Sequence, residues 1–284
     1  MTLELIIGAS AGALYALAAV LAVLGVVRTE KPLPTAARAL PVTAAAGALC
    51  LGAVLILHGL RLEMFPAFGA FEAASWYAMA VTASYLYVSQ RYDLRALAAF
   101  LFPYQAGLVL LGLLYLTATP IIPANLRTSM LGLHVATAFA GYGLFTIESV
   151  VAAAYLLQDR NLKRRNFGPV YRNLPALETL DRVMFELIGP AFFLFSVSIA
   201  MGVVLAHVNK WGVRWTTDPK VLATGFTWAV YGLLFHLRRG ADRHWRKVAW
   251  VAVLGFLCVL LAFLGVHLLA KSMHNFGFLG QTDG

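Results

Sequence analysis

Residues 5–27 read LIIGASAGALYALAAVLAVLGVV and contain no charged side chain. A helix rises about 1.5 Å per residue, so a run of this length crosses the roughly 30 Å hydrocarbon core of a bilayer. The four residues before it, MTLE, carry no basic side chain, and the run is too long for the core of a cleavable signal. We therefore expect this run to remain in the protein as its first membrane span.

Further apolar runs of similar length follow along the chain. The predicted spans lie near 5–27, 39–60, 69–89, 96–118, 131–157, 183–208, 220–237 and 248–271. Only 12% of the 284 residues are charged, 61% are hydrophobic and the mean hydropathy is +0.77. The chain has too little polar surface to enclose a water-soluble core of this size. The sequence predicts an all-α membrane protein, a single integral domain over 1–284 with about eight transmembrane helices.

Basic residues predict the orientation of this bundle. Alternating the loops places one group on one side: Arg28, Lys31, Arg38, Arg91, Arg95, Arg160, Lys163, Arg164, Arg165, Arg172, Arg238, Arg239, Arg243, Arg246 and Lys247, with Arg182 at its edge. The other side has only Arg61, Arg127, Lys210, Arg214, Lys220 and Lys271. Short cytoplasmic loops collect positive charge. We therefore expect a bacterial cytoplasmic (inner) membrane protein with both termini outside, whose net charge of +9 reflects topology rather than nucleic-acid binding.

Other kinds of chemistry find little support in the sequence. Cys50 and Cys258 lie inside separate apolar runs, so neither a CxxC pair nor a disulfide framework is present. No grouping typical of nucleophilic catalysis or phosphate binding occurs, and we predict no catalytic residue. Any enzymatic role would be as part of a larger system.

The seven histidines sort by depth in the predicted bundle. His58, His134, His207 and His274 fall at the outer ends of spans, and His236 lies near the inner face. Haem iron accepts two axial imidazoles from opposite sides of its ring, so two histidines at one depth are a candidate ligand pair. His134 and His274 fit best, and His58 is close enough in depth to compete. For each, the alternative is a hydrogen bond to a neighbouring helix.

A tryptophan-rich loop, WGVRWTTDPK at 211–220, lies at the same predicted face. Trp211 and Trp215 beside two imidazoles indicate a site for a large flat cofactor, with haem the first candidate. The alternative is that both are aromatic anchors at the bilayer interface. Asp218 followed by Pro219 predicts an N-cap and the first turn of the next span, whatever the loop binds.

Acidic residues inside the predicted spans are the remaining polar feature. Glu148, near the middle of the fifth span, must be protonated, paired or facing a polar cavity. It either lines a path below the outer site or makes an interhelical hydrogen bond. Glu72 begins the third span and is placed to meet a cation or a histidine of the outer site. Arg182 and Glu186 have the i,i+4 spacing of a helical ion pair.

From about Leu131 to Phe278 the chain resembles the CcsA/CcmC group of haem-handling membrane proteins and their relatives HemX and YpjD. The segments that carry the resemblance are Leu133-His134-Val135 with Gly141-Tyr142, Leu180-Asp181-Arg182 through Gly202 and Ala206, Trp211-Gly212 with Trp215 and Asp218-Pro219-Lys220, Trp228 and Tyr231 leading to His236-Leu237-Arg238, and Trp245-Arg246 followed by His274-Asn275-Phe276-Gly277. Their order is more specific than any one of them. The chain's length is close to that of HemX and YpjD.

The resemblance implies roles for these residues. The tryptophan loop, including Asp218, would hold the haem edge, while His134 and His274 would bind the iron. His236 resembles a ligand of a second haem site inside the membrane, whose partner lies in a companion subunit. His58 resembles the second-span histidine of YpjD and HemX. The loop departs from the family pattern, because Thr217 replaces a third tryptophan and Val221 replaces a glutamate.

Together these observations predict a protein that binds haem b non-covalently and holds or delivers it at the periplasmic face for cytochrome c maturation. Its partners would be membrane lipid, a companion subunit and an apocytochrome c acceptor. A HemX-like or YpjD-like accessory protein that does not deliver haem is the second hypothesis, which the altered loop favours. A transporter of small ions or metals is the third, and the absence of repeat symmetry or paired broken helices counts against it.

Overall fold

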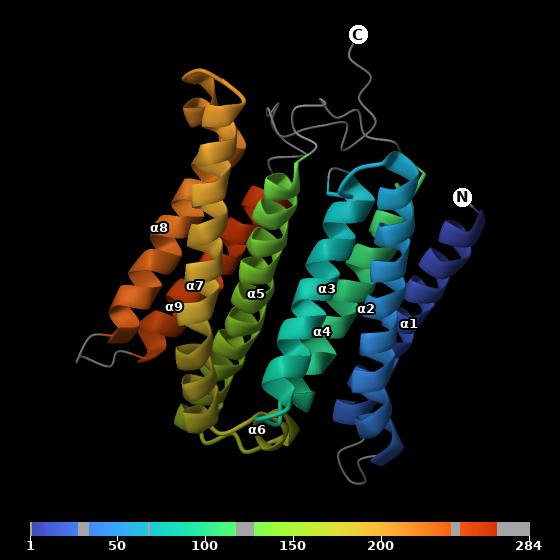
Figure 1. Cartoon of the computed structure of the whole chain (residues 1–284). Coiled ribbons are helices and arrows are strands. Elements are labelled where there is room, and N and C mark those ends of the chain that lie inside the picture. Colours follow the sequence, from blue (N-terminus) through green and yellow to red (C-terminus); the bar gives the residue numbers. More distant parts are fainter. Residues whose placement is uncertain (1, 28–33, 68, 118–127, 240–244, 266–284) are drawn as a thin grey trace.

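The computed structural model describes residues 2–27, 34–67, 69–117, 128–239 and 245–265 (Figure 1). Within these ranges the chain is helical, with short turns between the helices. The α-helices are α1 (Thr2–Val27), α2 (Pro34–Leu62), α3 (Ala70–Ser89), α4 (Arg95–Leu113), α5 (Ser129–Lys163), α6 (Pro169–Asn173), α7 (Leu177–Val208), α8 (Pro219–Arg239) and α9 (Trp245–Leu260). A 3-10 turn, η2 (Arg214–Thr217), precedes α8, and a π-helical turn, η3 (Leu261–Gly265), follows α9.

Each predicted span coincides with one long helix. Helices α1, α2, α4, α5, α7 and α9 are apolar and long enough to cross a membrane. Helices α3 and α8 hold the same place in the alternating path but carry more polar residues. The eighth predicted span, 248–271, is described only as far as residue 265. The structure therefore confirms a multi-pass helical bundle, while eight crossings remain a prediction.

The helices form two groups that meet along α3 and α5. Helix α1 packs on α2 and α4, and α5 packs on α7 and α9 as well as on α3. Glycines permit the closest approaches. At Gly143 of α5 an added Cβ would lie 2.7 Å from the Ala80 carbonyl carbon of α3. At Gly141 it would lie 3.2 Å from the Phe195 amide nitrogen of α7. Such contacts allow van der Waals packing between backbones, which holds helices together in lipid.

Buried polar side chains bond between helices rather than to water. Tyr15 of α1 lies 2.9 Å from Thr82 of α3, and the Thr82 hydroxyl donates to Gln105 of α4 at 2.9 Å. Ser149 of α5 donates to the Ala252 carbonyl of α9 at 2.8 Å. These bonds satisfy groups that would otherwise be costly in a membrane interior.

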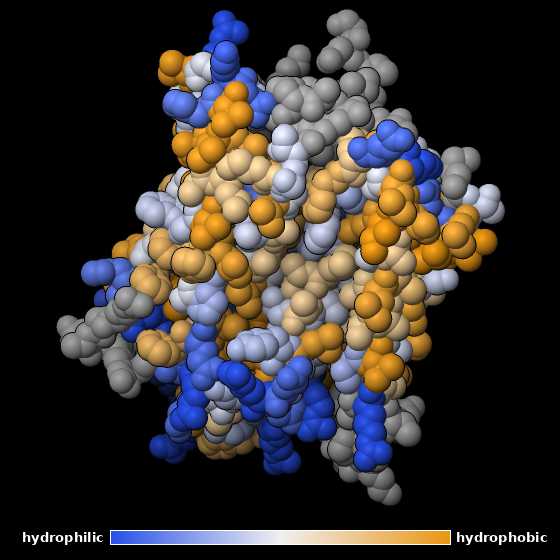
Figure 2. All heavy atoms as spheres, viewed as in Figure 1, coloured by the Kyte–Doolittle hydropathy of each residue, from blue (hydrophilic) through white to orange (hydrophobic). Residues whose placement is uncertain are grey.

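The alternating path gives the bundle two ends. We call one the His134 end; it contains the starts of α1, α3, α5 and α8 and the ends of α2, α4 and α7 (top of Figure 1). We call the opposite end the Arg238 end; it contains α6 and the ends of α3, α5 and α8. Figure 2 shows apolar side chains over the middle of this face and hydrophilic ones gathered towards both ends, as expected for a protein embedded in a bilayer.

Candidate functional site

His134 lies on the second turn of α5 and is bonded to α7. Its Nδ1 is 2.7 Å from the Ser198 carbonyl oxygen, and the Ser198 hydroxyl donates to the His134 carbonyl at 2.9 Å. A carbonyl oxygen can only accept, so Nδ1 carries the proton. The neutral ring then has its lone pair on Nε2. Histidines that bind metals are typically oriented in this way, with one ring nitrogen donating to a carbonyl and the other facing the metal.

Gly202 of α7 leaves room for the ring beside this bond. An added Cβ at Gly202 would lie 2.9 Å from Cε1 of His134 and 3.4 Å from its Nδ1. The imidazole therefore occupies the space that a larger residue on α7 would fill. Ser198 and Gly202 are one helical turn apart, so a single face of α7 both bonds and accommodates the ring.

The tryptophan loop closes over the same end of the bundle. Lys210 and Gly212 have positive φ angles of 52° and 66°, which turn the chain away from α7. Trp211 is tied back by its amide to the Ala206 carbonyl at 3.1 Å. Its side chain belongs to one hydrophobic cluster with Met64, Ala67 and Leu131. Leu131 is one turn before His134, so the structure brings Trp211 to the end of α5 that carries this histidine.

The second half of the loop is ordered by Asp218. Its carboxylate accepts from the Lys220 amide at 2.9 Å and from the Val221 amide at 3.4 Å, which confirms the predicted N-cap of α8. Trp215 lies in η2 and is partly exposed. Thr217, which replaces the third tryptophan of the family pattern, donates to the Arg214 carbonyl at 3.0 Å.

A buried histidine and glutamate form a second polar cluster at the His134 end. His58 of α2 and Glu72 of α3 are 0% and 2% exposed, and Nδ1 lies 3.0 Å from Oε1. The contact has ion-pair distance but not the alignment of a hydrogen bond, and Nε2 of His58 has no partner among the described residues. Glu72 therefore meets a candidate site histidine, as predicted. A second imidazole therefore lies at the His134 end, inside the bundle.

Phe65 and Trp76 connect this cluster to α5. Their rings stack with centroids 5.4 Å apart, and the indole of Trp76 donates to the Pro66 carbonyl at 2.7 Å. An added Cβ at Gly132 would lie 3.0 Å from the Phe65 ring. The loop between α2 and α3 thus packs between the two histidine-bearing regions.

His236 lies elsewhere. It is exposed on the last turns of α8, at the Arg238 end. His58 and His134 are at the opposite end, so His236 does not share a site with either within this chain. His207 is exposed at the end of α7. His274, the predicted partner of His134, lies outside the described residues.

Glu148 is buried in the middle of α5 at 1% exposure. Neither of its oxygens has a hydrogen-bond partner among the described residues, so the interhelical bond considered for it is not observed there. The buried hydroxyl of Tyr231 lies near Glu148 and Ser149. These groups form a polar patch within the apolar part of the bundle, away from the tryptophan loop.

The predicted pairing of Arg182 with Glu186 is wrong. Arg182 instead bonds to Glu178, one turn earlier, at 3.1 Å. Glu186 accepts from the Tyr92 hydroxyl at 2.6 Å, and this bond to a carboxylate raises the pKa of Tyr92. The Glu186 carboxylate, which helical spacing alone assigned to Arg182, is thus bonded to Tyr92 in the α3–α4 turn.

Sequence reasoning also missed a buried ion pair at the Arg238 end. Arg238 of α8 is buried and donates to the Asp181 carboxylate at 2.7 Å and to the Asp181 carbonyl at 2.6 Å. Both residues stand in segments that carry the family resemblance, which was the only indication of their importance. Ser198 and Gly202 were missed in the same way, since their roles depend on which face of α7 meets α5.

The fold and the His134 end define a multi-pass helical membrane protein with an oriented imidazole and a tryptophan-bearing loop at the same end. The family "Cytochrome C assembly protein" matches residues 64–274, and the chain belongs to that family. It is similar to the protein named "Cytochrome c biogenesis protein CcsA" from Guillardia theta, with 28% identity over 252 residues, covering 81% of this chain and 83% of that protein. CcsA proteins of Microcystis aeruginosa and Parasynechococcus marenigrum are 27% and 29% identical, covering 81% and 82% of this chain and 84% of each relative.

Proposed function

We propose that this protein binds haem b non-covalently at the His134 end and holds or delivers it during cytochrome c maturation. The orientation of His134 by the Ser198 carbonyl is the observation that carries the proposal. It fixes the tautomer in which Nε2 can bind a metal. Membership of the cytochrome c assembly family, and relatives named for cytochrome c biogenesis, support the same role.

We assign each residue at this end a separate role in haem binding. His134 and His274 would supply the imidazole nitrogens that hold the haem iron. Trp211 and Trp215 would cover the ring, and Asp218 would hold the loop that carries them. His58, with a buried Nε2 and Glu72 beside it, is the alternative ligand at this end. His236 would belong to a second site, completed by a companion subunit.

We place the His134 end at the periplasmic face of a bacterial cytoplasmic membrane. Exposed basic residues gather at the Arg238 end, including Arg91, Arg160, Arg164 and Arg172. Positive charge in short loops favours the cytoplasmic side. Haem held at the His134 end would then face the compartment in which an apocytochrome c could accept it.

Absorption spectroscopy of the purified full chain tests this proposal. We expect a Soret band that shifts or disappears in His134→Ala. His207→Ala is the matched control, because His207 is an exposed histidine at the same end of the bundle. A purified protein that contains no haem and takes up none on titration would falsify the proposal.

An accessory role without haem delivery is the second candidate, favoured by Thr217 and Val221 in place of the family's tryptophan and glutamate. The Thr217 hydroxyl is used within the loop itself. Deletion of the gene separates the two roles. Loss of c-type cytochromes indicates delivery, whereas unchanged c-type cytochromes together with haem binding by the purified chain indicate an accessory protein.

A further inference from the structure

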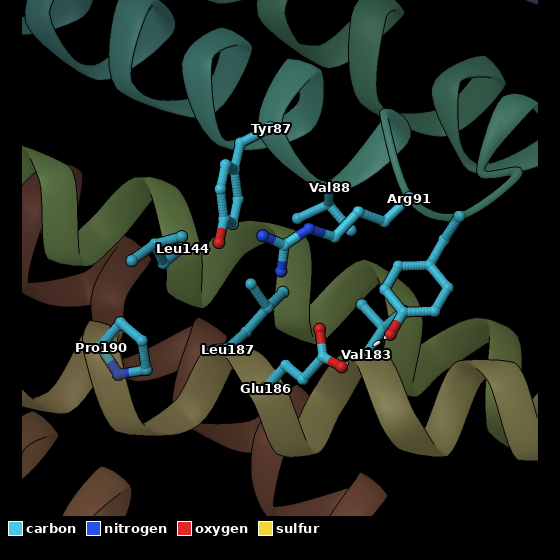
Figure 3. Close-up of a pocket in the computed structure, with 9 residues that line it drawn as sticks. Tyr87, Val88, Arg91, Leu144, Val183, Glu186, Leu187 and Pro190 are labelled. Atoms are coloured by element: carbon cyan, nitrogen blue, oxygen red, sulfur yellow. Dashed lines mark hydrogen bonds between the residues drawn. The ribbon is translucent and has the colours of Figure 1, made fainter.

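A groove runs along α3 where it faces α5 and α7. It consists of two cavities of about 430 and 420 Å³ that share Tyr87 and Leu144 in their walls. The first lies towards the Arg238 end, and its lining adds Arg91, Glu186 and Pro190 (Figure 3). The second extends towards the His134 end as far as Trp76. Because Tyr87 and Leu144 line both, the two cavities are neighbours along α3, and we treat them as the two halves of one groove.

The half at the Arg238 end is charged. Figure 3 shows Arg91 reaching from the end of α3 into the groove, with the Glu186 carboxylate on α7 turned towards the same space. The Arg91 guanidinium lies 5.1 Å from the centre of the Tyr87 ring, and no carboxylate within the described ranges forms an ion pair with it. Glu186 accepts from the Tyr92 hydroxyl. One cationic and one anionic group therefore face a single cavity.

The other half is mainly apolar. Small side chains from both helices line it together with a few larger ones; the lining residues are Trp76, Met79, Ala80, Ala83, Ser84, Ala136, Phe139 and Ala140. From Tyr87 back to Trp76 the helix rises about 16 Å at about 1.5 Å per residue. One leaflet of a bilayer has about 15 Å of hydrocarbon, half of the roughly 30 Å core. The apolar half thus matches the depth of one acyl chain.

We propose that this groove binds one phosphatidylethanolamine molecule of the leaflet at the Arg238 end. Arg91 would bind the phosphate, because guanidinium groups pair well with phosphate oxygens. Glu186 would meet the ammonium group, and an acyl chain would lie along Ala83 and Ala140. The pairing of one positive with one negative group favours a zwitterionic headgroup over an anionic one. This inference needs only a membrane-embedded chain and does not depend on haem.

Native mass spectrometry of the full chain from vesicles of phosphatidylethanolamine and phosphatidylglycerol tests the proposal. We expect one retained phosphatidylethanolamine on the wild type. Arg91→Ala should lower retention about tenfold, since it removes a charge-assisted hydrogen bond. Ala83→Trp should also lower retention, because the indole fills the apolar half while the charged half is intact. Arg164→Ala is the control, an exposed arginine at the same end outside the groove.

Glu186→Gln tests the headgroup assignment. It should remove the preference for phosphatidylethanolamine while phosphate binding persists. Equal retention by wild type, Arg91→Ala and Ala83→Trp would overturn the site. Retention of phosphatidylglycerol in preference to phosphatidylethanolamine by the wild type would overturn the choice of lipid. If Arg164→Ala lost as much retention as Arg91→Ala, general surface charge would explain the result and the site would be overturned.

Discussion

Replacement of Gly202 by alanine should weaken haem binding, and it should do so only by disturbing His134. The added Cβ would lie 2.9 Å from Cε1 of the imidazole, about half an ångström inside ordinary contact. The ring cannot absorb this shift freely, because its Nδ1 is held 2.7 Å from the Ser198 carbonyl. Either the ring turns and the hydrogen bond lengthens, or α7 moves away from α5.

The expected size follows from overpacking costs of about 1–3 kcal/mol. If the strain falls on the orientation of the ligand, haem affinity should drop roughly 5- to 150-fold. When a metal-binding histidine loses the hydrogen bond made by its other ring nitrogen, metal affinity falls by a comparable amount, about 10- to 100-fold. Titration of the purified variant with haemin, followed at the Soret band, measures this change.

Gly189→Ala provides the matched control on the same helix. Its added Cβ would meet only the Phe235 ring at 3.9 Å, which is ordinary contact, so haem affinity should be unchanged. The double variant His134→Ala/Gly202→Ala should bind no more weakly than His134→Ala, because both changes act through one ring. Wild-type affinity in Gly202→Ala would refute the assignment of His134 as a ligand held in this orientation.

Two further predictions concern the Arg238 end. Arg238→Ala should lower the stability of the folded chain in detergent by about 3 kcal/mol, because it removes the buried partner of the Asp181 carboxylate. Thermal unfolding that matches the wild type would contradict this. Arg182→Ala is the control: its ion pair with Glu178 is exposed to solvent, so its loss should change stability very little. The raised pKa of Tyr92 means that its bond to Glu186 contributes stability below the phenol's ordinary pKa of about 10, and that this contribution is lost as pH rises through the higher folded-state pKa. Tyr92→Phe should therefore flatten the fall in unfolding temperature above pH 10, and an unchanged alkaline profile would count against it.

The helices could be predicted from the sequence because the bilayer sets their minimum length. Each predicted span overlaps one of these helices, and α5 and α7 extend past their spans at the Arg238 end. Hydropathy does not report these extensions, since a helix that leaves the membrane can continue with polar residues. The N-cap at Asp218 was also predictable, because capping depends on neighbours two and three residues away.

Contacts between helices were harder to predict. Glu178 and Glu186 both lie one helical turn from Arg182, so spacing alone does not say which one pairs with it. Glu186 bonds to Tyr92 on another element, and Arg182 pairs with Glu178. The depth of His134 followed from its place in the span, whereas its bond to Ser198 depends on the relative rotation of α5 and α7. The convergence of His134 with His274 stays a prediction, because His274 lies outside the described residues.

The relative position of α5 and α7 connects these observations. Gly141 lies two turns below His134, and an added Cβ there would be 3.2 Å from the Phe195 amide nitrogen and 3.3 Å from the Ala191 carbonyl oxygen. This contact fixes how closely the two helices approach just below the site. Phe195 precedes Ser198 by three residues, so the same approach determines whether the imidazole reaches the Ser198 carbonyl. A larger residue at Gly141 would separate the helices and release the ring, although it touches neither His134 nor the tryptophan loop.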